Sequence, residues 1–204
     1  NKWRFYKVSK FIKENYEEDK ANIISEYNNK GYRDAKIISD TIYLNSDNTI
    51  TIEIKLDEGE PYLFGNIDFI GNTKYSNNEL LNQLGIDSGD VFNQSILDSR
   101  LFGTPEGTDI SSLYLDNGYL FFNATPVEIS TNNNIIDLEI RLYEGDQARI
   151  NKVNVKGNTK TQDHVIMREL RTRPGDLFKR SDIMRSQRVL AQMQYFDPEA
   201  FDVK

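Results

Sequence analysis

Two segments of the chain alternate apolar and polar residues. Every second position is isoleucine or leucine in both, at Ile50, Ile52, Ile54 and Leu56 and again at Ile136, Leu138, Ile140 and Leu142. This alternation predicts β-strands with one buried face and one solvated face. Asparagine-rich turns at 45–48 and 131–134 precede the two segments, so each is expected to form a hairpin with the strand before it, 32–43 and 119–130.

Apolar residues at helical spacing predict helices around these hairpins. The first set is Ala21, Ile23, Ile24 and Tyr27, which is expected to face inward in a helix that ends at Gly31. Ser76 is expected to cap a helix that ends at Gly85, and a second helical region covers 94–117 with an interruption at 103–107. Further helices are expected at about 161–170 and from a capping Ser181 onward.

Four landmarks of the sequence recur 86 positions later. They are Glu58-Gly59, the turn from Gly71 to Lys74, Gly89-Asp90 and Phe92, which match Glu144-Gly145, the turn from Gly157 to Lys160, Gly175-Asp176 and Phe178. A spacing of this length indicates a tandem repeat of small domains. An apolar first strand is expected in the second and third repeats, at 64–70 and 150–155.

The repeat divides the chain into three units. Residues 1–59 are expected to lack a first strand and first helix, residues 60–146 to form a complete unit, and residues 147–204 to stop before a last strand. An insertion is expected near 102–108, because the matching segment of the last unit is ten residues shorter. The order β-α-α-β-β predicts an α+β fold, with two helices on one face of a three-stranded mixed sheet.

The composition leaves little material for catalysis. The chain has no cysteine and a single histidine, His164, which argues against zinc-thiolate sites and against a serine, histidine and aspartate triad. Residues 87–90 lack the ligand spacing of an EF-hand and the lysine of a phosphate-binding loop. We therefore expect no enzyme, no catalytic residues, and no metal or cofactor site. A carboxylate-based hydrolase or a glycan-binding protein of the cell envelope remains an alternative.

Charge is distributed unevenly along the chain. The net charge is -7, which argues against a nucleic-acid partner. From Gln147 to Lys204, however, 12 lysines and arginines face 7 acidic residues, so this part carries +5 and the rest carries -12. The basic part is either an ordinary solvated surface or the part nearest an acidic partner.

A small open sheet has edges with unpaired backbone groups. Such an edge can accept a strand from another chain with little dependence on its sequence. Bulges, charges or a neighbouring unit can also block an edge, and the sequence leaves both possibilities open.

This combination of features resembles the POTRA domains of the BamA family of outer-membrane β-barrel assembly factors. The features are an apolar strand ending in Gly-Asn-Thr, a helix, Gly-Asp-x-Phe, a second helix, Gly-Tyr and two strands that close on Glu-Gly. The last unit is similar to the membrane-proximal domain of the family. Two departures are Gln194, which stands where the other units have glycine, and the insertion in the middle unit.

The resemblance implies a periplasmic array, tethered to the outer membrane through a C-terminal transmembrane β-barrel that is absent from this sequence. Such an array receives unfolded outer-membrane protein precursors by edge-strand addition and docks accessory lipoproteins. The POTRA region of a polypeptide-secreting outer-membrane transporter is an alternative of the same kind.

The resemblance also implies two docking surfaces. Client strands are expected at the second strand of the complete unit and its approach, with the residues Tyr119, Leu120, Phe121, Phe122, Val127 and Ile129. A helical lipoprotein is expected in the last unit, at Met167, Arg168, Glu169, Arg171, Arg173 and Pro174.

Overall fold

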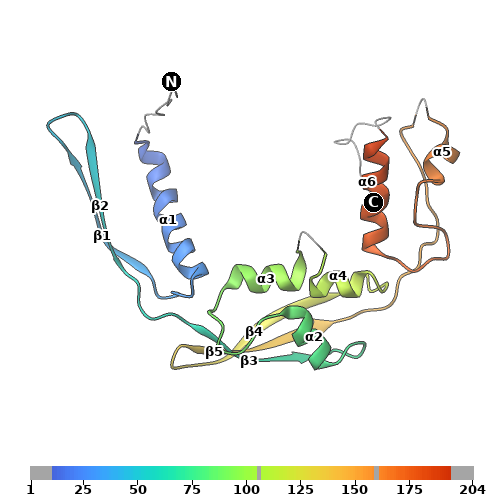
Figure 1. The fold of residues 1–204 in the computed structure, drawn as a ribbon, viewed down its shortest axis with the longest axis horizontal. Helices are drawn as coiled ribbons and strands as arrows, with labels where there is room; N and C mark the ends of the chain where they lie inside the picture. Colours follow the sequence, from blue (N-terminus) through green and yellow to red (C-terminus); the bar gives the residue numbers. More distant parts are fainter. Residues whose placement is uncertain (1–10, 105–106, 159–160, 194–204) are drawn as a thin grey trace, which may run out of the picture.

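The described parts of the three predicted units follow one another around a U-shaped molecule (Figure 1). The computed structural model describes residues 11–104, 107–158 and 161–193. Its elements are α1 (Lys13–Asn29), β1 (Lys36–Leu44), β2 (Ile50–Asp57), β3 (Leu63–Ile70), α2 (Asn77–Leu84), α3 (Gln94–Phe102), α4 (Ile110–Leu115), β4 (Asn123–Asn132), β5 (Ile135–Tyr143), α5 (Asp163–Met167) and α6 (Arg180–Gln192). Helices α1, α3, α4 and α6 line the inside of the U (Figure 1). The sequence also predicts that the second strand of the last unit begins at Tyr195, and this position lies outside the described residues.

The middle unit forms the base of the U around a closed core. Its sheet has the order β3-β5-β4, with β3 parallel and β4 antiparallel to the central β5. The inward residues of β5 pack with the apolar faces of α2, α3 and α4 and are almost fully buried. This arrangement confirms the predicted α+β fold, with its helices on one face of a mixed three-stranded sheet.

Local sequence signals explain where the first helix of this unit begins and ends. Ser76 and Glu79 form a reciprocal capping box at the start of α2. Gly85 ends the helix in the left-handed conformation, as predicted. The hairpin differs from the prediction, because a two-residue turn at Asn133 and Asn134, both with positive φ, joins β4 to β5.

Residues 119–122 do not belong to the strand in which the sequence placed them. They form a turn, and β4 begins only at Asn123. The reason is packing, because the ring of Phe122 stacks on Tyr114 at 4.1 Å between centroids and the ring of Tyr119 lies 5.8 Å from it. These contacts fold the segment over the end of the core instead of extending it along β5.

The second helical region of the middle unit is interrupted as predicted. Asn93 caps α3 and Asp109 caps α4, each through its side-chain oxygen. Asp109 is buried, but its carboxylate accepts hydrogen bonds from the Thr104 amide and from Ser112. In the last unit the matching region is the single continuous helix α6.

The first unit covers its apolar residues less well than the sequence predicted. It contains α1 and the two-stranded hairpin of β1 and β2. Ala21, expected to face inward, is exposed, whereas Tyr16 is buried. Ile50 and Ile52, expected on a half-buried strand, are exposed, because no third strand and no second helix among the described residues packs against this hairpin.

The last unit has helices but no sheet in its described residues. The predicted strand at 150–155 is absent, and only an isolated bridge between Arg149 and Leu177 forms nearby. A strand is defined by its pairing. Ile150 exchanges backbone hydrogen bonds with Gly175 and Asp176, whereas residues 151–155 pair with no described segment. Ser181 does not cap α6 either: the helix begins at Arg180, and the Ser181 amide donates to Asp116 Oδ1 of the middle unit.

The two junctions between units use the same backbone geometry. The Tyr62 amide donates to the Gly31 carbonyl at 2.8 Å, and the Ala148 amide donates to the Gly118 carbonyl at 2.7 Å. Both glycines have positive φ, and a Cβ atom would lie 3.1 Å from the Tyr62 carbonyl oxygen in one case and 3.4 Å from the Ala148 carbonyl oxygen in the other. The repeated glycines therefore hold each unit closely against the next.

Candidate functional site

One edge of the middle sheet is open and the other is partly covered. At the β3 edge, Phe64 exchanges backbone hydrogen bonds with Asp90 and Gly89, and Leu63 bridges to Val91. Along β4, by contrast, no backbone hydrogen bond to any described residue other than those of β5 is present. The outer side of β4 is therefore the better candidate for adding a strand.

Two features limit the open edge of β4. Pro126 lies in the middle of the strand and has no N–H to donate; in an edge strand the proline nitrogen faces away from the sheet. The register with β5 shifts between Glu128 and Ser130, which makes Ile129 a bulge. A strand added at this edge could form a regular ladder of backbone hydrogen bonds with residues 123–128, except that Pro126 has no N–H group to donate.

The residues predicted at this edge divide into two groups. Tyr119 and Phe122 pack against Tyr114 in the core, and Val127 is half-buried. The exposed ones are Leu120, Phe121 and Ile129, with exposed fractions of 41%, 65% and 58%. Only this second group offers apolar surface to a partner.

Arg33 of the first unit reaches the end of the β4 edge. Its guanidinium forms an ion pair with Glu128 at 2.9 Å and lies 5.0 Å from the Phe92 ring centroid and 5.6 Å from that of Tyr62. No local sequence pattern predicts this contact, because Arg33 and Glu128 are 95 positions apart. The neighbouring unit thus occupies part of the side-chain space at the bulged end of β4.

Glu144 connects the Gly-Asn-Thr turn, from Gly71 to Lys74, to the end of β5 through hydrogen bonds. Its carboxylate accepts hydrogen bonds from the Thr73 amide (2.8 Å), the Lys74 amide (3.0 Å), the Tyr114 hydroxyl (2.9 Å) and the Thr73 hydroxyl. Burial acts to raise the pKa of Glu144, but these hydrogen bonds hold the pKa below its ordinary value. Burial, and then the bond to Glu144, raise the pKa of Tyr114. The Glu-Gly landmark of the repeat is therefore structural.

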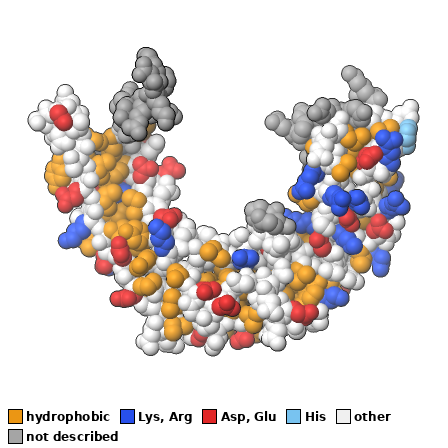
Figure 2. Space-filling view, viewed as in Figure 1, with side chains coloured by type: hydrophobic (Ala, Val, Ile, Leu, Met, Phe, Trp, Pro, Cys, Tyr) orange, Lys and Arg blue, Asp and Glu red, His pale blue; other side chains and the backbone are white. Residues whose placement is uncertain are grey.

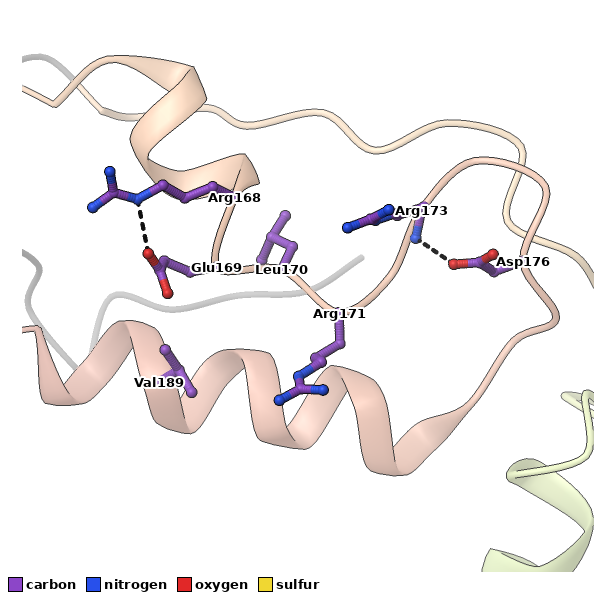
Figure 3. A pocket seen from close by; sticks show the side chains of 7 residues that line it. All are labelled: Arg168, Glu169, Leu170, Arg171, Arg173, Asp176 and Val189. Carbon is purple, nitrogen blue, oxygen red and sulfur yellow. Dashed lines mark hydrogen bonds and ion pairs between the residues drawn. The ribbon is translucent and has the colours of Figure 1, made fainter.

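The second predicted surface forms a basic pocket of about 550 Å³ in the last unit (Figure 3). It is lined by Arg168, Glu169, Leu170, Arg171, Arg173, Asp176 and Val189. Four predicted docking residues are thus brought together, whereas Met167 and Pro174 are outside the lining. The prediction missed Val189, which α6 supplies, because its approach depends on tertiary packing.

Specific hydrogen bonds hold this basic pocket in shape. The Arg171 amide donates to the Ser186 hydroxyl of α6 at 3.0 Å. The Arg173 amide donates to Asp176 Oδ2 at 2.9 Å, a bond repeated in the middle unit between the Asp87 amide and Asp90 Oδ2. The aspartate of the repeated Gly-Asp landmark therefore stabilises a turn in both units. In the last unit this turn supports the neighbouring arginines.

The electrostatics of the basic pocket suit an anionic protein surface. Arg168 forms an ion pair with Glu169 at 2.8 Å, and Arg171 and Arg173 add two further positive charges (Figure 3). Guanidinium groups bind carboxylates through paired hydrogen bonds. No group of three or more histidine, aspartate or glutamate side chains suited to a metal ion occurs within 11–104, 107–158 and 161–193. Over the same ranges, no helix combines the length and apolar character needed to cross a membrane.

Comparison with known proteins places the whole chain in one family. The POTRA family model, described as a surface antigen variable number repeat, matches residues 1–59, 62–145 and 148–203. A putative outer membrane protein assembly factor of Treponema pallidum is 28% identical over 207 residues, covering 98% of this chain and 24% of the relative. The outer membrane protein assembly factor BamA of Nitratidesulfovibrio vulgaris is 31% identical over 187 residues, covering 88% and 22%.

The fold is also similar to that of a solved structure. The crystal structure of POTRA domains 3–5 of Haemophilus influenzae BamA matches with a TM-score of 0.63 at 21% identity, covering 93% of this chain and 73% of that one. The chain spans about a quarter of the length of the curated relatives named above. The predicted resemblance is confirmed: the chain belongs to the POTRA family, and the proteins that it resembles include BamA outer-membrane assembly factors.

Proposed function

We propose that this chain is a periplasmic docking segment of an outer-membrane assembly factor, and that it receives strands of unfolded outer-membrane proteins at the β4 edge. It acts by binding and positioning clients, without catalysis. The observation that carries the proposal is the difference between the two edges of the middle sheet. Residues 89–92 occupy part of the β3 edge, whereas β4 pairs only with β5 among the described residues.

The chemistry of the β4 edge fits a receptor for many different clients. Backbone N–H and C=O groups bind an added strand without reading its sequence. The exposed Phe121 and Ile129 lie at the two ends of the regular segment and add apolar contact. Pro126 removes one donor, which keeps each binding event weak and reversible. Weak binding suits a segment that must release its client.

A gain-of-binding variant tests this proposal. Pro126→Ala restores an N–H on the outer side of β4, so the affinity for a fluorescent peptide copied from a β-strand of an outer-membrane barrel should rise about fivefold, the value of one net hydrogen bond. Fluorescence anisotropy measures the affinity, and circular dichroism checks that the variant is folded. The control peptide carries N-methyl groups on alternate amides and cannot pair with an edge. Equal affinity of Pro126→Ala and the unchanged chain for the first peptide would contradict strand binding at the β4 edge.

We further propose that the basic pocket docks an accessory lipoprotein through acidic side chains on its surface. Arg168, Arg171 and Arg173 support this assignment, because they surround one hollow next to α6. The double variant Arg168→Glu and Arg171→Glu should abolish co-purification of accessory lipoproteins with the full-length protein. The matched double variant Lys152→Glu and Lys156→Glu changes exposed charges of the same unit outside the pocket and should retain them. Equal loss in both variants would contradict a pocket-specific contact.

A further inference from the structure

A second hollow lies next to the basic pocket on α6, at the corner between the middle unit and the last unit, and Val189 lines both hollows. Its volume is about 600 Å³, and α4 and α6 supply most of its lining. Ser112 and Asp116 form the wall on the middle unit, and Arg180, Arg185 and Arg188 form the wall on α6. This α4–α6 groove opens on the inside of the U, where Figure 2 shows lysine and arginine side chains along the arm that carries α6.

The α4–α6 groove combines positive charge with an apolar centre. Arg180 contacts the Ser112 hydroxyl at 3.4 Å, and none of the three arginines takes part in an ion pair within the described part of the chain. Met184 lies among them with half of its surface exposed, at 50%. Methionine is flexible and adapts to the shape of a partner's apolar side chain.

The spacing of the lining residues defines the shape of a partner. Residues 181, 184, 185, 188 and 192 of α6 face the groove, which is the three-and-four spacing of a single helix ridge. Such a ridge packs into the groove of another helix. Arginines on both sides of Met184 would then meet acidic residues on both sides of an apolar residue.

We propose that the α4–α6 groove binds an acidic amphipathic helix of a partner protein. An apolar residue of that helix packs on Met184, and its carboxylates pair with Arg185 and Arg188. This surface lies apart from the β4 edge, and its lining shares Val189 and no other residue with the basic pocket. Its three arginines all differ from those of the basic pocket, so the inference does not depend on either earlier assignment. It holds a partner in contact with two units at once.

The position of the groove favours a protein helix over a membrane surface. The groove lies at an inner corner between α4 and α6 (Figure 1), and a flat bilayer cannot enter a concave corner. A second copy of this chain could offer its own acidic helix, since α1 carries Glu14, Glu17 and Glu18. Self-association is therefore one of the outcomes that the experiment must separate.

The experiment measures binding of a fluorescein-labelled helical peptide built from glutamate with leucines at spacings of three and four. Arg185→Glu with Arg188→Glu should weaken binding by the full chain at least about tenfold. Lys152→Glu with Lys156→Glu changes two exposed charges of the last unit that line neither hollow, so this matched control should stay within about twofold of the unchanged chain. Met184→Ala should weaken binding about threefold without changing charge, and high salt should weaken binding by the unchanged chain.

Several results would overturn this inference. One is equal weakening by the Arg185 and Arg188 double variant and by the Lys152 and Lys156 double variant, because that would show a general charge effect. Undiminished binding of a peptide with glutamine in place of glutamate would exclude carboxylate recognition. Arg185→Lys with Arg188→Lys keeps both positive charges and should retain most of the binding. This control shows that substitution at these two positions does not by itself disrupt folding. Capture of phosphatidylglycerol vesicles without the peptide, or salt-sensitive self-association in analytical ultracentrifugation that the Arg185→Glu and Arg188→Glu variant loses, would assign the groove to a different occupant.

Discussion

The same alternating pattern occurs in β2 of the first unit and β5 of the middle unit, with opposite results for burial. The alternating apolar residues of β5 are Ile136, Leu138, Ile140 and Leu142, and all four are buried. Those of β2 are Ile50, Ile52, Ile54 and Leu56, of which the first two are exposed and the others half-buried. The difference lies in their neighbours, because β5 is flanked by two strands and covered by helices while β2 pairs with one strand.

This comparison shows what alternation can and cannot predict. The pattern identifies the face of a strand that would be buried, since side chains on a strand point to alternate sides. How far that face is buried depends on elements that lie distant in sequence. In the middle unit those elements are β3 and the helices α2 to α4, which close the core.

The largest predicted effect comes from truncating matching isoleucines. Ile136→Ala should lower the free energy of unfolding of the middle unit by about 3 to 4 kcal/mol, because it leaves a cavity in a closed core. Ile50→Ala, the same change 86 positions earlier, should cost less than about 1 kcal/mol, because Ile50 is already 38% exposed. Hydrogen exchange followed by mass spectrometry reports on each unit separately. Equal losses of protection would contradict the difference in burial.

A smaller difference in stability loss is expected when the matching glutamates, Glu144 and Glu58, are each replaced by glutamine. Glu144→Gln should destabilise the middle unit by about 2 kcal/mol, because the amide group replaces one of two oxygens that accept hydrogen bonds. Glu58 accepts a hydrogen bond from the Tyr27 hydroxyl at 3.0 Å. Glu58→Gln should therefore cost less than about 1 kcal/mol. Chemical unfolding monitored by hydrogen exchange would distinguish the two, and a larger effect at Glu58 would be the contrary result.

The Glu144 contribution also has a predictable dependence on pH. The folded-state pKa of this carboxyl is below its ordinary value, so the stabilisation is fully present above the ordinary pKa. It is lost as the pH falls through the folded-state pKa. The acid-induced loss of stability of the middle unit should thus be shallower in Glu144→Gln than in the unchanged chain, and identical slopes would contradict the assignment.

The smallest effect concerns the two junctions. Both have the same backbone hydrogen bond, but Arg33 adds an ion pair with Glu128 only at the first one. Arg33→Leu should cost at most about 1 kcal/mol, because the pair is partly exposed, and should broaden the distance distribution between spin labels at Glu18 and Asp98. The chain has no cysteine of its own, so labels can be placed without background. Glu128→Gln should broaden the distance distribution similarly. Unchanged widths in both variants would contradict the claim that this ion pair restricts the first junction.

Local signals predicted much of the fold. The capping box at Ser76, the left-handed Gly85 and the repeated Gly-Asp turns depend on residues close in sequence, and all have clear physical causes. Errors occurred where tertiary contacts decide the outcome. Packing on Tyr114 turned 119–122 away from the strand, and residues 151–155 have no partner strand among the described residues.

The candidate surfaces show the same division. The family resemblance led us to expect a docking surface from Met167 to Pro174, and Arg168, Glu169, Arg171 and Arg173 of this segment do line one pocket. The α4–α6 groove was not predicted, because it forms only where two units meet. Nor did the β4 sequence reveal that Ile129 is a bulge, since a register shift depends on pairing with β5.

Photo-crosslinking tests the central claim, that clients pair with β4, most directly. A benzophenone side chain placed at Thr125 on β4 or at Asp68 on β3 compares two exposed positions on opposite edges of one sheet. We expect crosslinks to the barrel-strand peptide from Thr125, with a higher yield when Pro126 is replaced by alanine, and few from Asp68. Equal yields from both positions, or crosslinks from Asp68 alone, would contradict it.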